Sequence, residues 1–292
     1  MNSPISVNGT AAVRTSVRVV KRRVAGAVSG PAETDFLAIE DPLEIELAGT
    51  RRPGDGGGTR MVTMRTPGHD AELIHGFLYC EGIIRAAADV VAIEFSEPVG
   101  EAPPTRVRLR LRDGLASRAA SEVGRSFAVH SACGVCGTSS LARLALAPSL
   151  RVDDAVRVDA GVFHGFPARM HREQATFRQT GGLHAAAVFT PDGALVVSRE
   201  DIGRHNALDK ALGAELLAGR LPTSGRILCV SGRMSYEIMQ KALVARIPVV
   251  AGVGAPSSLA VSLANDFNVT LIGFLRGGSY NIYSAPERVS CK

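Results

Sequence analysis

The sequence predicts an α/β protein in which helices cover both faces of a mostly parallel or mixed sheet, preceded by a smaller α+β domain. The first observation is the alternation of short apolar runs with helical patterns over residues 183–274, which is typical of a sheet with parallel strands. The second is that residues 43–47 and 106–111 alternate apolar and polar side chains, as half-buried strands do. A chain of 292 residues with 46% hydrophobic residues can bury a core for both parts.

Apolar spacing and turn residues predict the order of the elements. The first part is expected to contain strands at residues 43–47, 60–65, 90–95 and 106–111 and a helix at 70–82. The second part is expected to contain strands at 183–189, 194–198, 227–230, 248–253 and 269–274 and helices at 160–172, 204–217, 234–245 and 257–265. We therefore expect an α+β domain at residues 31–150, ending in a loop with two cysteines, and an α/β domain at residues 151–292.

The net charge of +5 comes from a leading segment. Five basic residues precede any acidic one: Arg14, Arg18, Lys21, Arg22 and Arg23. Without these five, 28 basic residues balance 28 acidic residues. We interpret residues 1–30 as a basic, disordered arm and expect no nucleic-acid partner. No segment has the apolar length of a secretory signal or of a membrane span, so we expect a cytoplasmic protein without a membrane partner.

Two of the five cysteines form a close pair. Cys80 and Cys229 lie in apolar patterns and are expected to be buried and inert. Cys133 and Cys136 form a Cys-x-x-Cys loop with glycines, and the helix predicted after it would favour a thiolate. Such a pair suits disulfide exchange, sulfur transfer as a persulfide, or metal ligation. The spacing alone leaves all three open.

Polar side chains gather where strands of the second part end. His184 opens a strand after a glycine pair, where it is either a hydrogen-bonded core residue or part of a pocket. The strand-to-helix stretch 198–210 is dense in polar groups, among them His205. Part of that density is natural for a solvated helix start, and the rest predicts functional groups at one edge of the sheet.

Three segments after strands, at residues 231–233, 254–258 and 274–279, combine glycine with arginine or serine. Glycines let a phosphate approach the backbone, and Arg233 and Arg276 supply forked donors. Each segment alone is weak evidence, because glycines also make ordinary turns. Together they predict a large phosphorylated ligand such as a nucleotide-bearing cofactor.

A zinc deaminase would carry a glutamate two residues after His184 and a Pro-Cys-x-x-Cys motif later in the chain. Here Ala186 stands at the glutamate position, and the cysteine pair comes before the histidine. Deaminase chemistry is therefore poorly supported, because no carboxylate is placed to move the proton.

In their order and spacing these motifs resemble the FdhD family over about residues 35–285. The residues that carry the resemblance are Cys-Gly-Val-Cys-Gly at 133–137, Thr-Gly-Gly-Leu-His-Ala at 180–185, Arg-Glu-Asp-Ile-Gly-Arg-His-Asn-Ala-Leu-Asp-Lys at 199–210, Ser-Gly-Arg-Met-Ser-Tyr-Glu at 231–237 and Ala-Pro-Ser-Ser-Leu-Ala at 255–260.

The resemblance implies a sulfurtransferase required for formate dehydrogenase activity, with a cytidine-deaminase-like catalytic domain that lacks deaminase activity. It implies that a cysteine desulfurase supplies persulfide sulfur, which passes to a bis-molybdopterin guanine dinucleotide cofactor carried as cargo for the formate dehydrogenase catalytic subunit. The persulfide cysteine maps onto Cys133, with Cys136 as its partner. The cofactor-binding segment maps onto Phe274, Leu275, Arg276, Gly277, Gly278 and Ser279.

To that segment we add Arg233, His184 and His205 as candidate cofactor-binding residues. No structural metal is expected, and a homodimer is reasonable for this fold. Two alternatives stay open: a zinc-dependent deaminase-like hydrolase, and a non-catalytic chaperone that only holds the cofactor.

Overall fold

The computed structural model describes residues 13–25, 28–48, 59–98, 103–116, 150–153 and 155–291. The predicted cysteine pair, Cys133 and Cys136, lies outside the described residues.

A six-stranded sheet forms the centre of the second part, with the order β13-β12-β11-β10-β8-β9. Its strands are β8 (His184–Phe189), β9 (Leu195–Asp201), β10 (Ile227–Val230), β11 (Val249–Gly252), β12 (Thr270–Arg276) and β13 (Ser279–Ser284). Strands β10, β11 and β12 are parallel, because the helices between them return the chain to the same edge. The other three strands pair antiparallel with their neighbours. The predicted mixed sheet is confirmed, whereas β13 was not predicted.

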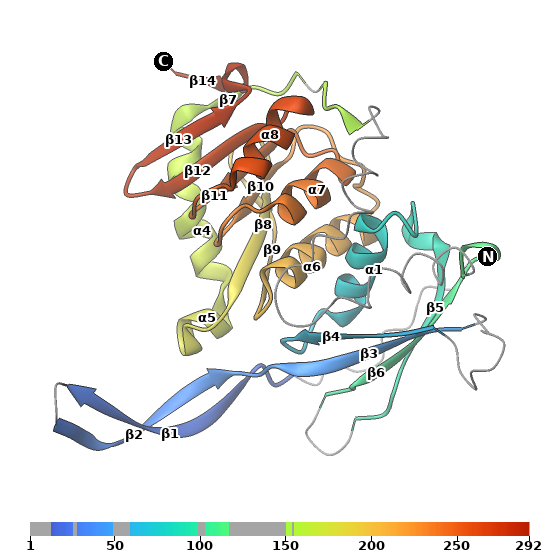
Figure 1. The fold of residues 1–292 in the computed structure, drawn as a ribbon, viewed down its shortest axis with the longest axis vertical. Helices are drawn as coiled ribbons and strands as arrows, with labels where there is room; N and C mark the ends of the chain where they lie inside the picture. Colours follow the sequence, from blue (N-terminus) through green and yellow to red (C-terminus); the bar gives the residue numbers. More distant parts are fainter. Residues whose placement is uncertain are drawn as a thin grey trace.

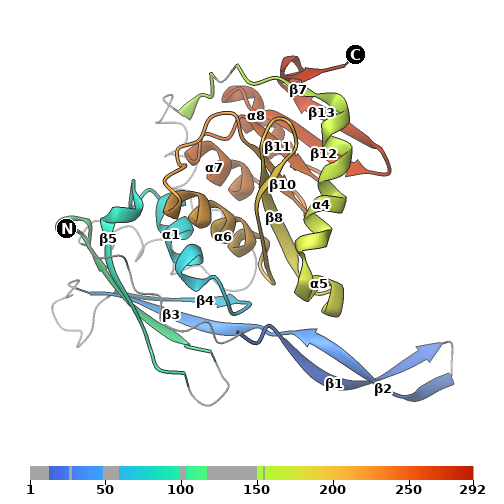
Figure 2. The same ribbon diagram turned by 180° about the vertical axis from the view of Figure 1, so that it is seen from behind.

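Helices cover both faces of this sheet (Figures 1 and 2). On one face lie α6 (Arg204–Leu217), α7 (Tyr236–Val244) and α8 (Ser258–Asp266), and on the other lie the 3-10 helix η4 (Ala160–Gly165) and α4 (Phe166–Glu173). Alternate side chains of β10 enter two separate cores, with Leu228 and Val230 in one and Ile227 and Cys229 in the other. The sheet is therefore buried on both sides, as its apolar strands predicted.

The single helix predicted at residues 160–172 is divided in the structure. A 3-10 turn precedes α4, and α5 (Ala175–Thr180) follows it. Pro167 lies in the first turn of α4 and has no amide hydrogen, so an α-helix cannot continue through it from residue 163. The apolar spacing predicted helical structure here but not this break.

A second sheet of four strands, in the order β4-β3-β6-β5, belongs to the first part. Its strands are β3 (Asp41–Leu47), β4 (Thr59–Arg65), β5 (Val90–Phe95) and β6 (Arg106–Leu111); helix α1 (Asp70–Cys80) follows β4, and the 3-10 helix η1 (Ala87–Asp89) precedes β5. Strand β14 (Val289–Ser290) lies near the C-terminus, after η5 (Pro286–Arg288), and pairs with β7 (Val158–Asp159). The strands predicted at 43–47, 60–65, 90–95 and 106–111 are confirmed. The domain boundary at residue 150 stays a prediction.

Helices α1 and α6 join the two sheets and touch through their backbones (Figure 1). A Cβ atom at Gly76 would lie 1.8 Å from the Asp209 carbonyl oxygen, and one at Gly213 would lie 1.8 Å from the Glu72 carbonyl oxygen. Only glycine fits at these two positions. One continuous core runs from Leu43 in the small sheet through α1 and α6 to Leu228 in the large one.

The leading segment differs from the predicted disordered arm. Strand β1 (Ser16–Ala25) pairs antiparallel with β2 (Val28–Ala38), and the hairpin projects beyond α5 (Figures 1 and 2). The β-branched residues of this segment favour a strand, and Lys21 pairs with Asp35 across it at 3.0 Å. The expectation of disorder is therefore wrong for residues 16–25 and 28–30.

Within the described ranges, no helix combines the length and apolarity needed to cross a bilayer.

The backbone contact between α1 and α6 predicts that Gly213→Ala destabilises the protein. Helix propensity alone would make this change favourable by about 0.5–1 kcal/mol, but the added methyl group must push the helices apart, at a cost of about 1–3 kcal/mol. We therefore expect the Gly213→Ala variant to have a lower free energy of unfolding than the wild type, measured by urea denaturation. Ser262→Ala, on the exposed side of α8, is the matched control and should change little. A Gly213→Ala variant as stable as the wild type would contradict the contact.

Candidate functional site: the glycine-lined edge of the six-stranded sheet

The predicted site residues that the structure describes lie around one edge of the six-stranded sheet, where β9, β10 and β11 end and β8 begins. His184 pairs with Asp201 in register at this edge. The Ser231 amide donates to the Ala185 carbonyl at 2.9 Å, and the Ser231 hydroxyl accepts from the Ala185 amide at 2.9 Å. The start of β8 and the end of β10 are thereby fixed against each other.

Two glycines bring the backbones of adjacent corners into contact. The Gly254 amide donates to the Gly232 carbonyl at 3.2 Å, and a Cβ atom at Gly254 would lie 2.7 Å from that oxygen. A Cβ atom at Gly232 would lie 3.3 Å from Nδ1 of His184. The sequence predicted glycine corners for phosphate approach; in the structure these glycines also allow the corners to pack together.

The positive charges of two arginines lower the pKa of the half-buried His184. Arg204 is the first residue of α6, and the exposed Arg233 lies between β10 and α7. Burial lowers the pKa of His184, and the positive charges of Arg204 and Arg233 lower it further, against the opposing charge of Asp201. The imidazole therefore stays neutral at lower pH than a free histidine, in a region of positive potential.

His205 lies beside an acidic group that the sequence did not single out. Its Nε2 is 3.9 Å from Oε2 of Glu237, and the Ser235 hydroxyl donates to the same oxygen at 2.7 Å. Burial opposes the charge of Glu237, but the bond from Ser235 and the charges of His205 and Arg204 outweigh it and lower its pKa. A carboxylate six residues after Ser231 in a strand-to-helix corner is the signal that could have identified it.

Most of the polar stretch 198–210 serves a different purpose from the predicted one. Asp201 forms a buried ion pair with Lys210 at 2.7 Å and accepts a hydrogen bond from the Thr66 amide at 3.1 Å. Lys210 also donates to the Thr66 carbonyl at 2.8 Å, and Asn206 donates to the Met64 carbonyl at 2.7 Å. These residues hold the end of β4 against α6. Arg204 and His205 take no part in these contacts and lie at the sheet edge instead.

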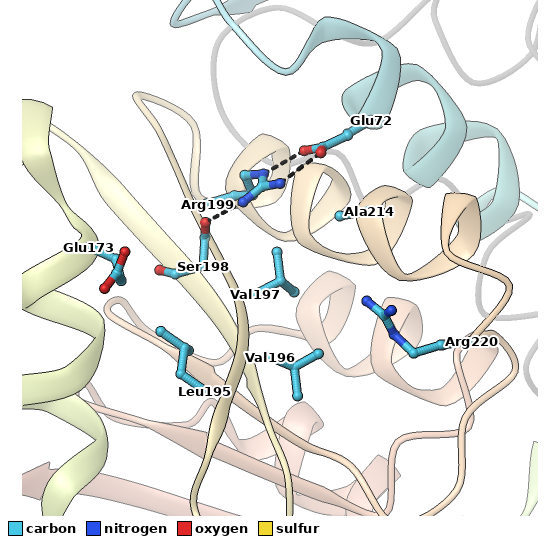
Figure 3. Close-up of a pocket in the computed structure, with 9 residues that line it drawn as sticks. All are labelled: Glu72, Glu173, Leu195, Val196, Val197, Ser198, Arg199, Ala214 and Arg220. Atoms are coloured by element: carbon cyan, nitrogen blue, oxygen red, sulfur yellow. Dashed lines mark hydrogen bonds and ion pairs between the residues drawn. The ribbon is translucent and has the colours of Figure 1, made fainter. Parts of the chain in front are cut away.

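Arg199 also joins the two parts of the chain (Figure 3). Its guanidinium donates twice to Glu72 of α1, at 2.5 and 2.7 Å. Although burial disfavours the charge, hydrogen bonds from Arg199 and His69 lower the pKa of Glu72 to about 2. This pair is structural, because both charges are satisfied within the protein.

A pocket of about 460 Å³ opens beside this ion pair, along the edge strand β9 (Figure 3). Its lining comes from α1, α4, β9, α6 and the segment after α6: Glu72, Glu173, Leu195, Val196, Val197, Ser198, Arg199, Ala214 and Arg220. None of the predicted site residues lines it. The glycine-lined edge and this pocket are therefore separate features.

The predicted cofactor segment 274–279 is the end of β12 and a hairpin turn rather than a loop after the last strand. Gly277 and Gly278 have φ of 60° and 75° and connect β12 to β13 in a two-residue turn. Leu275 is buried in a core, Arg276 lies over the Phe274 ring at 5.8 Å, and Ser279 begins β13. A glycine pair between two strand-like runs could have predicted this hairpin.

Segment 274–279 contacts the sheet edge through Phe274, whose amide donates to the Gly254 carbonyl at 3.0 Å.

The cysteines that the structure describes are Cys80, Cys229 and Cys291. Cys80 and Cys229 are buried, as predicted, and burial raises the pKa of Cys229 to about 12. Burial also raises the pKa of Cys80. Neither thiol is available as a thiolate nucleophile near neutral pH. Among the residues with described positions, no three histidine, cysteine or acidic side chains group as metal ligands would.

The fold and the edge define an α/β protein with a glycine-lined, positively charged sheet edge. A family model described as FdhD/NarQ matches residues 38–290. The chain belongs to the FdhD/NarQ family.

Relatives named sulfur carrier protein FdhD align with nearly the whole chain. The protein from Mycolicibacterium paratuberculosis is 44% identical over 279 residues, covering 94% of this chain and 98% of the relative. The protein from Mycobacterium tuberculosis is 42% identical over 286 residues, covering 94% and 99%. The protein from Sulfurisphaera tokodaii is 44% identical over 257 residues, covering 88% of this chain and 92% of the relative.

A crystal structure from Desulfotalea psychrophila, described as a formate dehydrogenase accessory protein, has the same fold. Its TM-score is 0.69 at 20% identity, and the match covers 95% of this chain and 100% of that one.

The buried ion pair beneath the edge predicts that Lys210→Met strongly destabilises the protein. The change leaves the Asp201 carboxylate buried without its cation, which typically costs about 3–5 kcal/mol. Lys21→Met removes the exposed ion pair of the β1–β2 hairpin and is the control; it should have little effect. Chemical denaturation of both variants checks this. An equal decrease in the free energy of unfolding in the two variants would contradict the structural role of Lys210.

Proposed function

We propose that this chain is a sulfurtransferase that carries persulfide sulfur to the molybdenum cofactor of a formate dehydrogenase. The observation that carries the proposal is that relatives more than 40% identical over nearly their whole length are named sulfur carrier proteins. The crystal structure of similar fold is described as a formate dehydrogenase accessory protein, which agrees with that role. Because Cys80 and Cys229 are buried, the Cys133 and Cys136 pair is the better candidate for sulfur chemistry.

In the proposed first step, the Cys133 thiolate attacks the terminal sulfur of a persulfide on a cysteine desulfurase. The bond between the two donor sulfurs breaks, the desulfurase cysteine leaves as a thiolate, and Cys133 becomes a persulfide. One sulfur–sulfur bond replaces another, so no oxidant or reductant is consumed.

In the proposed second step, the Cys136 thiolate attacks the inner sulfur of the Cys133 persulfide. The terminal sulfur leaves as sulfide toward molybdenum, and a disulfide forms between the two cysteines. The cysteine sulfurs supply the two electrons that reduce the transferred sulfur. A dithiol reductant then restores the pair for the next cycle.

The cargo in this proposal is bis-molybdopterin guanine dinucleotide. We assign its binding to the glycine-lined edge, with Arg233, His184 and His205, and to the adjoining segment 274–279. The support is the positive potential that the two arginines create around a neutral His184 and the bare backbone of Gly232 and Gly254. Anionic, phosphate-bearing ligands favour such surroundings.

We also propose that the six-stranded domain has a cytidine-deaminase-like fold. The support is a mixed sheet whose antiparallel first strand begins with His184 and has Ala186 where a deaminase would carry its catalytic glutamate.

The rival function, a zinc-dependent hydrolase, requires about one tightly bound zinc per chain. Metal analysis of the purified protein separates the two.

The proposed partners are a cysteine desulfurase and the catalytic subunit of formate dehydrogenase, met in the cytoplasm by a homodimer of this chain. Size-exclusion chromatography with light scattering tests the dimer. Co-purification with each enzyme tests the partners.

The most direct test incubates the chain with a cysteine desulfurase and cysteine, followed by mass spectrometry of its peptides. We expect one added sulfur atom on the Cys133 peptide of the wild type and none on the Cys133→Ala variant, which should also fail to mature formate dehydrogenase. Cys136→Ala should still accept sulfur but release it poorly. Cys291→Ala, which changes an exposed thiol, is the matched control and should load normally.

If Cys133→Ala still matures formate dehydrogenase, the assignment of the sulfur carrier is wrong. If both cysteines of the pair can be replaced without loss, the protein is a non-catalytic chaperone for the cofactor.

A further inference from the structure

The β1–β2 hairpin extends away from both sheets as a two-stranded ribbon (Figures 1 and 2). Among the described residues, its two strands of 10 and 11 residues pair only with each other. A two-stranded hairpin without a third strand or a covering helix is only marginally stable in water. A ribbon of this length therefore gains stability when a partner covers one of its faces.

The two faces of this ribbon carry different charges. Side chains directly across an antiparallel pair share a face, so the even-numbered residues of both strands line one face and the odd-numbered residues line the other. We call the first the arginine face, and it consists of Ser16, Arg18, Val20, Arg22, Ala32, Thr34, Phe36 and Ala38. The arginine face contains no acidic residue at these described positions. The opposite face contains Glu33 and Asp35, and Asp35 pairs with Lys21 at 3.0 Å.

The arginine face combines unneutralised charge with apolar side chains. Within the described ranges, neither Arg18 nor Arg22 forms an ion pair. Val20, between them on the same face, is 74% exposed, and the half-buried Phe36 lies directly across from Arg18. Arginine together with aromatic side chains is typical of the energetically important part of protein–protein interfaces.

The charges on this face favour an acidic protein surface over other partners. A nucleic-acid site typically neutralises about 6–10 phosphates, more than two arginines can contact. A second copy of this chain that used the same face would bring like charges together. An acidic surface of a different protein would neutralise both arginines and cover Val20 and Phe36.

The base of the hairpin is fixed next to the glycine-lined edge. On β1, the Ser16 hydroxyl donates to Oε1 of Gln179 on α5 at 2.8 Å. On β2, the Ala38 Cβ atom would lie 3.7 Å from a Cβ atom at Gly182, which is two residues before His184 at the edge. A protein bound to the hairpin is therefore held beside the edge to which the cargo is assigned.

We propose that the arginine face is the docking surface for an acidic surface of the formate dehydrogenase catalytic subunit. This inference rests on the proposed function, in which that subunit receives the cargo. It deepens the function by assigning the contact to the hairpin. The catalytic subunit is chosen over the desulfurase because the subunit must take up the cargo at the adjoining edge.

The test is biolayer interferometry of the full-length protein with the purified, cofactor-free catalytic subunit of a formate dehydrogenase. Arg18→Gln and Arg22→Gln should each raise the Kd by roughly fivefold or more, because each removes a charge that meets an acidic group. Val20→Thr keeps the β-branched shape but replaces a methyl group with a hydroxyl, and it should raise the Kd by roughly threefold.

Lys21→Gln is the matched control, because it removes the same charge from the same strand but on the opposite face. Its Kd should stay within about twofold of the wild-type value. If Lys21→Gln weakens binding as much as Arg18→Gln, binding follows net charge and the arginine face is not the docking surface. If Arg18→Gln and Arg22→Gln bind like the wild type, the arginines serve only to keep an edge strand from pairing with other chains, and the proposal is wrong.

Hydrogen exchange of the wild-type protein gives a second measurement that needs no variant. The amides of β1 and β2 should exchange quickly in the free protein and more slowly with the catalytic subunit bound, because the subunit stabilises the hairpin. Unchanged exchange in the bound state would contradict the proposal. Tighter binding of poly-uridylate RNA than of the subunit, lost in Arg18→Gln, would assign the face to nucleic acid instead.

Persulfide loading of Cys133 separates this inference from the proposed function. Arg18→Gln and Arg22→Gln should both load sulfur normally. Failure of loading in the wild type would remove the sulfur-carrier function, whatever the binding results. Normal loading without binding of the catalytic subunit would instead overturn the docking surface and leave the sulfur carrier in place.

Discussion

The position of helix α6 is the constraint on which the rest of the structure depends. Gly213 brings its backbone against α1, where any larger residue would overlap the Glu72 carbonyl. Lys210 and Asn206 then hold the end of β4, and Asp201 closes the same network from β9. Because α6 is fixed along its length, its first turn reaches the sheet edge in one position.

The network separates two kinds of charged residue within a few positions of each other. The charges of Asp201, Lys210 and Arg199 are neutralised inside the protein and hold its two parts together. Arg204 and Arg233 form no ion pair with a described residue, and their positive charges lower the pKa of His184. The internal pairs leave a local excess of positive charge at an edge lined by glycine. A protein that handles an anionic cofactor needs such an excess, and this is how the fold supports the proposed function.

Much of the fold could be predicted from the sequence because its signals are local. The buried strands β10, β11 and β12 are short apolar runs between helical patterns, and their order follows from that alternation. The composition of residues 1–30, rich in Ser, Gly, Ala and Arg, hides the β-branched pattern of β1, and the Gly277–Gly278 pair that marks the β12–β13 hairpin is also typical of a phosphate-binding loop. The roles of Asp201 and Asn206 could not be predicted, because their partners, Thr66 and Met64, are more than 130 residues away in the chain. The cysteine pair was found by its spacing alone and lies outside the described residues.

We infer that helix α6 makes the small and large sheets one cooperative unit through their shared core. The chain contains no tryptophan, so single-tryptophan variants can report on each sheet separately: Phe95→Trp on β5 of the small sheet, and Phe177→Trp on α5 beside the large one. Equilibrium unfolding in urea, followed by fluorescence, should give the same midpoint and slope for both probes. Two separate transitions, with the small sheet unfolding while the large sheet remains folded, would show that α6 does not couple the two sheets.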